Sequence, residues 1–536
     1  MTSPLGATPR FSDANACKQW LKDLPLTNVP LVHATLTAQL ELLNRAPIAP
    51  LERLKISELL RSPVAFVQTE MARKYFGKPL PLETAERDTW NSVDSLWVAM
   101  DAAYRLSLQD CVEDGSDIVR HAALIAHRCL RYTGLRMMEH CRIYREPGKA
   151  LWRQAHELFA LAEQRGYALD AVKDSLNEQS DSTHCTAAYT QILLTHLADP
   201  YHLTPEQLNL LDRWLDKWAV RVTVAAQPPE HAALPLVAVD LAGTAAPCVV
   251  REGQAAVSAN TRYLDMERIA ATFQKRIKRL KKGADPVELG LGKDCTPRDC
   301  ESLLVTLYRH WCQAAPAKRD FSRRVGADKA QTALGLAAIH FFLGGEQPFK
   351  QPDEKEKLSQ REIHDLQFFG RISEKTEKLH VSQLGFGLET WQIQDESALG
   401  FRLIRPDQDG MRIRLKQLIA VRPADSSAYA LGVIKWLIFP LDGGLHIGVR
   451  ILPGLSLAVA ARPLPLIRDA ANKYTQAFLL SDMPVLREAA SLVLPIGWFS
   501  PGRLVEIQGA ESQTVKLLTL IEKGSDYERV RFERRP

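Results

Sequence analysis

The chain lacks the patterns that identify enzymes, membrane proteins and secreted proteins. It contains no HExxH, no GxSxG and no GxGxxG after a strand, and its 14 histidines are scattered. No apolar run approaches the roughly 20 residues of a membrane helix, and the opening sequence MTSPLGATPRFSDANA has no signal-peptide core. We therefore expect a cytoplasmic protein that has no catalytic residues, binds no metal and needs no cofactor.

Cysteine is present without a recognisable pattern. The nine cysteines are odd in number and widely spaced, and no CxxC pair occurs. The closest two, Cys295 and Cys300, have no second pair or histidine at zinc-ligand spacing. The sequence therefore predicts buried, reduced thiols rather than a metal site or a disulfide framework.

An excess of one charge is also missing, because 68 basic residues face 63 acidic ones for a net charge of +5. This balance does not support binding of nucleic acid over the whole surface. A local exception is the basic run at 275–282, whose cations spread around the predicted helix. We interpret it as a solvated helix end beside the negative end of the macrodipole. The alternative is that this run binds an acidic or phosphate-bearing partner. A further functional hypothesis is therefore a nucleic-acid-binding regulator that uses this helix.

The patterns that are present favour a helical N-terminal region, which we place at residues 1–225. Apolar residues of the segment 149–166 recur at helical spacing, and a glycine follows the last turn; they are Trp152, Ala155, Leu158, Phe159 and Ala162. This pattern resembles one helix of a tetratricopeptide-type hairpin, but no 34-residue recurrence accompanies it. We expect a solenoid-like helical bundle without a regular repeat.

Two further features refine this helical prediction. Thr204 begins a helix as its N-cap, with Pro205 in the first turn and Gln207 at the third position. Trp214 and Trp218 then share one helical face. We interpret these tryptophans as core residues, and a protein-binding groove is the alternative.

Residues 226–365 are predicted to form a connection and a second helical segment. The connection contains one strand-like run at 236–241, and helices are expected after Thr296 and at 333–343. The run GLGK at 290–293 is not a P-loop, because Val287 replaces the first glycine and Asp294 replaces the Ser or Thr that binds magnesium. This segment is therefore not expected to bind a nucleotide in the manner of a P-loop.

From about residue 366 the pattern becomes that of β-strands. Alternating apolar and polar runs predict strands in two sets, which we assign to a barrel at 366–460 and a β-rich extension at 461–536. The predicted strands are 388–394, 400–403, 412–421, 429–439 and 446–452 in the first set, and 489–494, 503–508, 514–522 and 528–533 in the second. The fold class is thus α+β and multidomain, with a helical N-terminal two-thirds followed by β-structure.

The first set of strands contains the polar motif Asp395-Glu396-Ser397-Ala398-Leu399-Gly400. This motif, the run 432–436 and the hairpin at 442–444 resemble the PilZ domain, a small β-barrel of bacterial cyclic di-GMP receptors with a [DN]xSxxG turn. The family also has an RxxxR pair upstream, where this chain has Arg371 and Lys375. Lysine cannot reproduce the planar, bidentate contacts of the second arginine.

The residues of this motif suit a dinucleotide on chemical grounds as well. Arg371 and Lys375 would supply cations for the phosphates, Asp395 and Ser397 would accept hydrogen bonds from guanine N–H groups, and Gly400 would allow close backbone approach. The alternative is an ordinary β-turn, in which the two polar side chains cap local N–H groups and the glycine takes a positive φ.

The resemblance implies a bacterial signalling effector. Its barrel would bind cyclic di-GMP, and its helical module would pass the signal to a protein partner. A scaffold or adaptor whose barrel has lost nucleotide binding is the second hypothesis.

Overall fold

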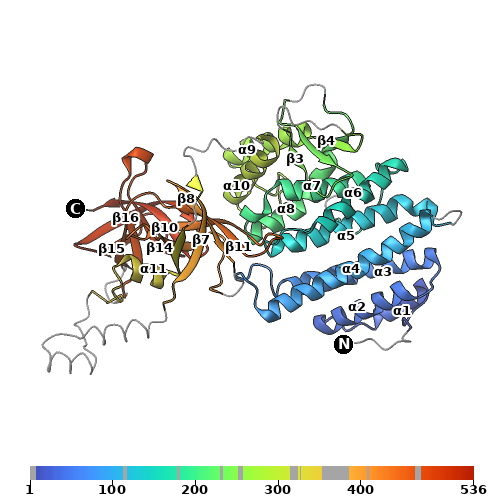
Figure 1. Cartoon of the computed structure of the whole chain (residues 1–536), viewed down its shortest axis with the longest axis horizontal. Helices are drawn as coiled ribbons and strands as arrows, with labels where there is room; N and C mark the ends of the chain where they lie inside the picture. The colour runs from blue at the N-terminus through green and yellow to red at the C-terminus, as the bar shows by residue number, and fades with distance from the viewer. Residues whose placement is uncertain are drawn as a thin grey trace. The chain divides into compact units, whose positions relative to one another are not determined.

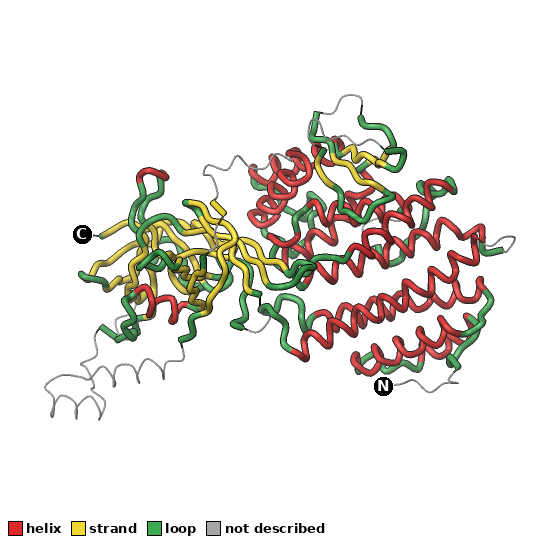
Figure 2. Tube along the Cα trace, viewed as in Figure 1, coloured by secondary structure: helices red, strands yellow, loops and turns green. Residues whose placement is uncertain are grey.

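The computed structural model describes residues 8–112, 117–177, 182–229, 233–250, 258–313, 324–325, 328–352, 386–406, 410–464 and 473–535. The chain divides into two compact units: Met1–Lys78 with Leu82–Lys318, and Pro79–Pro81 with Arg319–Pro536. Helices dominate the first unit and strands the second (Figure 2). The predicted α+β multidomain class, with a helical N-terminal region and a C-terminal β-region, is confirmed.

The first unit is a bundle of helices that pack on their neighbours in sequence (Figure 1). α3 packs on α4, α4 on α5, and α5 also contacts α6 and α7. The helices of its described part are α1 (Ala14–Lys22), α2 (Val29–Arg45), α3 (Pro50–Ala72), α4 (Thr84–Val112), α5 (Ala122–Arg142), α6 (Lys149–Gln164), α7 (Cys185–Leu197), α8 (Pro205–Trp218), α9 (Glu267–Lys281) and α10 (Pro297–Tyr308). Within the described ranges, no helix is both long and apolar enough to cross a membrane.

Local capping explains where several helices begin. At the start of α8, the Thr204 hydroxyl accepts a hydrogen bond from the Gln207 N–H, and the Gln207 side chain accepts one from the Thr204 N–H. Thr296 caps α10 in the same way through the N–H of Asp299. Both predicted helix starts are confirmed.

The apolar faces read from the sequence form the core of the first unit. All five periodic residues of α6 are buried. Trp214 and Trp218 are buried with ring centroids 5.0 Å apart, and the Trp214 indole donates a hydrogen bond to the Leu291 carbonyl at 2.9 Å. These two tryptophans are therefore core residues, as predicted, and they do not line a protein-binding groove.

The segment that follows the predicted boundary at residue 225 packs into the same compact unit as the N-terminal helices. A four-stranded antiparallel sheet follows the helices in the strand order β1-β4-β2-β3; its members are β1 (Thr223–Ala225), β2 (Val237–Asp240), β3 (Cys248–Val249) and β4 (Thr261–Asp265). Side chains of β2, β4, α9 and α10 join the same hydrophobic core as the N-terminal helices. The described residues of this segment up to 313 thus belong to the first compact unit, because burial is decided by contacts between distant segments.

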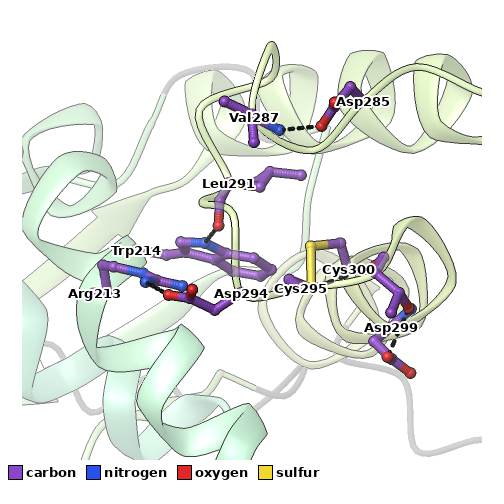
Figure 3. Close-up of a disulfide and its surroundings, with 10 residues drawn as sticks. Arg213, Trp214, Asp285, Val287, Leu291, Asp294, Cys295, Asp299 and Cys300 are labelled. Carbon is purple, nitrogen blue, oxygen red and sulfur yellow. Dashed lines mark hydrogen bonds and ion pairs between the residues drawn. A yellow bond between two sulfur atoms is a disulfide. The ribbon is translucent and has the colours of Figure 1, made fainter.

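Five of the nine cysteines are buried free thiols, and two others form a disulfide. Cys295 and Cys300 form a disulfide with a Cα–Cα distance of 5.9 Å (Figure 3). The first turn of α10 brings Cys300 back toward Cys295, which lies just before the capping residue Thr296. The prediction that every cysteine is reduced is therefore wrong for this pair, whereas the other seven are free, five of them buried.

The second unit begins with a seven-stranded sheet in the order β5-β7-β6-β9-β10-β11-β8, and β7 also pairs with β8 and closes the ring. Its strands are β5 (Arg324–Val325), β6 (Lys329–Leu334), β7 (Glu389–Ser397), β8 (Gly400–Arg405), β9 (Leu418–Pro423), β10 (Ala430–Ile438) and β11 (Leu445–Ile451). β5 and β6 precede the predicted barrel boundary at 366. The helix predicted at 333–343 starts later, as α11 (Leu336–Leu343), because residues up to 334 pair with β9.

The β-rich extension is a second, closed barrel in the order β12-β13-β14-β17-β16-β15. Its strands are β12 (Ser456–Pro463), β13 (Thr475–Leu480), β14 (Ser491–Pro495), β15 (Leu504–Gln508), β16 (Ser512–Lys523) and β17 (Tyr527–Arg534). Its interior contains buried aliphatic residues from all six strands. Of the strands predicted for both barrels, only the run 412–421 is displaced appreciably, since β9 starts at Leu418.

Candidate functional site

The polar motif lies on a tight hairpin between β7 and β8. Ser397 is register-paired with Gly400, so only Ala398 and Leu399 form the turn. A bulge between Ile393 and Asp395 shifts the register and places Asp395 opposite Arg402. Asp395, Glu396 and Ser397 thus belong to a strand, whereas the sequence suggested a turn.

Gly400 is required by the neighbouring strand. Its φ is not among the positive values of the described glycines, so it lacks the positive φ that the β-turn alternative would give it. A Cβ at this position would lie 2.0 Å from the Val449 carbonyl oxygen of β11. The sequence analysis expects Gly400 to let a ligand approach the backbone closely. In the structure, the segment that approaches Gly400 closely is β11.

The two candidate acceptors, Asp395 and Ser397, are half-buried on the same strand. The Ser397 hydroxyl lies 3.4 Å from the Gly400 carbonyl, to which it donates. Because a hydroxyl oxygen can accept hydrogen bonds while it donates one, Ser397 keeps acceptor capacity beside the Asp395 carboxylate. This pair of acceptors suits the N–H groups of a purine edge.

Next to Asp395, the sheet carries an arginine and an aromatic ring that sequence reasoning did not single out. The Arg402 guanidinium lies 5.7 Å from the centre of the Trp436 ring. Trp436 lies across Gly448, where an added Cβ would meet the indole nitrogen at 1.9 Å. The signal for Arg402 was its position two residues after the motif glycine, which places it on the strand that pairs with Asp395.

On the other side of β7, strand β5 brings a cation to the motif. Arg324 is register-paired with Glu396, and Val325 with Asp395. Arg324 is exposed. Arg319 and Arg323 lie outside the described residues, but in the sequence they directly precede Arg324 and have the RxxxR spacing of the PilZ family. The sequence carries this signal, but the segment between β6 and β7 separates it from the motif by more than 70 residues, so proximity in the sequence does not connect the two.

Arg371 and Lys375 lie outside the described residues. Their assignment to the ligand site stays a prediction. The structure therefore brings Asp395, Ser397 and Gly400 together on one hairpin and adds Arg324 and Arg402 from the adjoining strands.

A second charged group lies on the neighbouring strands. Arg450 of β11 and Lys435 of β10 both pair with the Glu522 carboxylate of β16, Lys435 at 3.3 Å. Burial opposes ionisation of Glu522, but the two cations outweigh it and hold its pKa below the usual range. These cations are neutralised within the protein, unlike Arg324, for which the described residues record no ion pair.

The described part of the chain contains no group of three or more His, Cys, Asp or Glu side chains that could hold a metal ion. The described residues of the candidate site supply hydrogen-bond acceptors, guanidinium cations and an aromatic ring.

Fold and site together define a protein with a helical module followed by two β-barrels, of which the first carries a PilZ-type motif. The chain belongs to the PilZ-domain proteins. It matches three models of one architecture: the cyclic-di-GMP receptor FimW N-terminal domain over residues 15–229, the FimW middle PilZ domain over 236–383 and the FimW C-terminal β-barrel domain over 459–535.

A curated relative that aligns over most of this chain is the cyclic-di-GMP receptor FimW of Pseudomonas aeruginosa. The two sequences are 22% identical over 558 aligned positions, which cover 94% of this chain and 88% of the relative. No solved structure matches the chain. The hairpin at 395–400 lies between the matches to the middle and C-terminal domains.

Proposed function

We propose that this chain is a cytoplasmic cyclic di-GMP effector without catalytic activity, and that its first barrel binds the nucleotide at the β7–β8 hairpin. The family match and the name of the curated relative, a cyclic-di-GMP receptor, support this proposal. The structural observation that carries it is the pairing of β7 with β8, which places Arg402 opposite Asp395. The pairing of β5 with β7 brings the chain that follows Arg319 and Arg323 to the same strand.

The chemistry of this surface fits the parts of the ligand. Asp395 and Ser397 would accept hydrogen bonds from the guanine N–H groups. Arg402, held against the Trp436 ring, would contribute a planar guanidinium for stacking or for a phosphate oxygen.

The remaining cations would come from one of two basic pairs. The first pair, Arg319 and Arg323, directly precedes β5 in the sequence and consists of two arginines. The second pair is Arg371 and Lys375, which the sequence predicts as ligand contacts from their position upstream of the motif. Since two arginines can make the bidentate contacts that an arginine and a lysine cannot, we favour the pair before β5.

We propose further that the helical first unit passes the signal to a protein partner. Cyclic di-GMP would act by binding one state of the protein more tightly than another, since a ligand shifts an equilibrium only through such a difference. The chemistry of the partner does not follow from the barrel.

Isothermal titration calorimetry of the full chain with cyclic di-GMP tests the proposal. Asp395→Asn should weaken binding at least tenfold, since a charge-assisted hydrogen bond contributes about 1.5 to 3 kcal/mol. Arg319→Ala/Arg323→Ala should do the same, and Arg371→Ala/Lys375→Ala should have a smaller effect. Lys516→Ala on the second barrel removes a cation that pairs with Glu533 and serves as the control.

The alternative is a scaffold whose barrel has lost nucleotide binding. It predicts no heat of binding at protein concentrations well above micromolar, with a folded barrel. If Arg371→Ala/Lys375→Ala weakens binding more than Arg319→Ala/Arg323→Ala does, the chain is still a receptor, but our choice of the arginine pair before β5 is wrong.

A further inference from the structure

The first unit contains a basic hollow that the barrel site does not use. It encloses about 400 Å³ and lies between η3 (Ala219–Arg221), α9 and the segment that follows α9. Four cations line it against one carboxylate; they are Arg221, Lys275, Arg276 and Arg279, with Glu288 as the carboxylate. The sequence suggested that the basic residues of α9 spread around the helix, but the fold gathers three of them with Arg221.

Arg276 lines this hollow and is held in place by two contacts. Its guanidinium carbon lies 5.7 Å from the centre of the buried Trp218 ring, and its Nε donates a hydrogen bond to the Leu289 carbonyl at 3.1 Å. This geometry holds the guanidinium plane in place before any ligand binds, which reduces the entropy lost on binding.

The charges around Arg276 are not neutralised within the described residues. Neither Arg221, Lys275 nor Arg276 has an ion pair there, and the Arg221 guanidinium donates instead to the Thr272 hydroxyl at 3.0 Å. Arg279 approaches Glu288 only at 3.9 Å, and both side chains are about half or more exposed. Such an exposed, loose pair contributes little.

The cations that line the hollow also repel one another. Burial lowers the pKa of Arg276, and the neighbouring Arg221 and Arg279 lower it further. Cations that repel one another around a concave space are stabilised when an anion enters that space.

The helix macrodipole does not account for this cluster. Cations near the C-terminal end of α9 are favoured by its partial negative charge, and this explains Lys278 and Lys281, which do not line the hollow. Arg221, however, comes from another element, and its approach to α9 brings like charges together. The interpretation of the basic run as a solvated helix end therefore does not explain the position of Arg221.

We propose that this hollow binds the phosphate or pyrophosphate group of a small phosphorylated ligand. Three guanidinium groups and one ammonium group suit a tetrahedral oxyanion, because guanidinium forks contact two phosphate oxygens at once. The volume lies within the range of small-molecule sites. A free pyrophosphate and a nucleoside diphosphate present the same chemistry. This inference does not rest on cyclic di-GMP binding at the barrel.

Calorimetric titration of the full chain with pyrophosphate, at constant ionic strength, tests the proposal. Lys275→Gln/Arg279→Gln should weaken binding at least tenfold, and it leaves the packing of Arg276 on Trp218 intact. The matched control is Lys278→Gln/Lys281→Gln, which removes the same charge from the same helix outside the hollow. It should change the affinity less than twofold.

A parallel titration with a nucleoside diphosphate identifies the source of the phosphate. Tighter binding than pyrophosphate with the same loss in Lys275→Gln/Arg279→Gln indicates a nucleotide, and weaker binding indicates a smaller ligand. Asp395→Asn should leave pyrophosphate binding unchanged, so this test and the barrel test can fail separately.

Three results would overturn the proposal. The first is no binding of pyrophosphate at millimolar concentration by the wild-type chain. The second is an equal loss in the two double variants, which would mean general attraction to a basic helix. The third is salt-dependent binding of a labelled single-stranded oligonucleotide that both double variants weaken equally while pyrophosphate has no effect, which would define a nucleic-acid surface.

Discussion

The motif glycine of the first barrel offers a test of what the motif is for. In Gly400→Ala the new methyl group would lie 2.0 Å from the Val449 carbonyl oxygen, whereas ordinary contact begins at 3.4 Å. The oxygen would have to move by about 1.4 Å, and it belongs to backbone that pairs with β8 and β10. Overpacking typically costs 1 to 3 kcal/mol, and a rigid obstacle favours the upper end, about 3 kcal/mol.

Differential scanning calorimetry of the full chain measures this cost in the transition of the second unit. A domain of 150 to 250 residues loses about 2 to 4 °C per kcal/mol, so the midpoint should fall by about 6 to 12 °C. Gly387→Ala is the control, because nothing lies within 4 Å of its added methyl and its φ is not positive. Its midpoint should stay the same or rise slightly.

Two outcomes would refute this reasoning. If Gly400→Ala unfolds within about 1 °C of the control, β11 does not require the glycine. If cyclic di-GMP affinity is lost while the midpoint is unchanged, the glycine serves the ligand directly. We expect affinity and stability to fall together.

Three further predictions concern charges and thiols elsewhere in the chain. Asp174 is buried among three arginines that hold its pKa well below the usual range despite burial, so Asp174→Asn should cost about 3 to 5 kcal/mol in urea unfolding at neutral pH. The difference should shrink as the pH falls below about 4, because Asp174 then takes up a proton in the unfolded chain while it stays ionised in the folded one. Burial raises the pKa of Asp526 to about 6, although its carboxylate accepts a hydrogen bond from the Leu418 N–H at 3.0 Å. Wild-type stability should therefore fall by up to about 3 kcal/mol as the pH rises from about 4 through 6, and Asp526→Asn should lose this fall; parallel curves would contradict the assignment. The Cys295–Cys300 disulfide predicts seven titratable thiols in the denatured, unreduced chain, and nine would show that the pair is reduced.

Local signals in the sequence determined much of the fold. The capping residues Thr204 and Thr296 and the periodic face of α6 depend on contacts within a few residues, which is why their helices could be predicted. Most strands of the two barrels were predicted for the same reason, since alternation of apolar and polar residues reports a half-buried strand directly. The motif Asp395 to Gly400 was likewise visible as a short run of letters.

Contacts between distant segments decided the rest. The sequence could not show that β5 lies beside β7, because the two strands are more than 60 residues apart, and this pairing is what brings Arg324 to the motif. It could not show that Arg221 faces α9 and turns a scattered set of cations into a hollow. Nor could it show that Gly400 is required by Val449. Hydrophobic periodicity determines which side of an element is buried, and tertiary packing alone determines what lies against it.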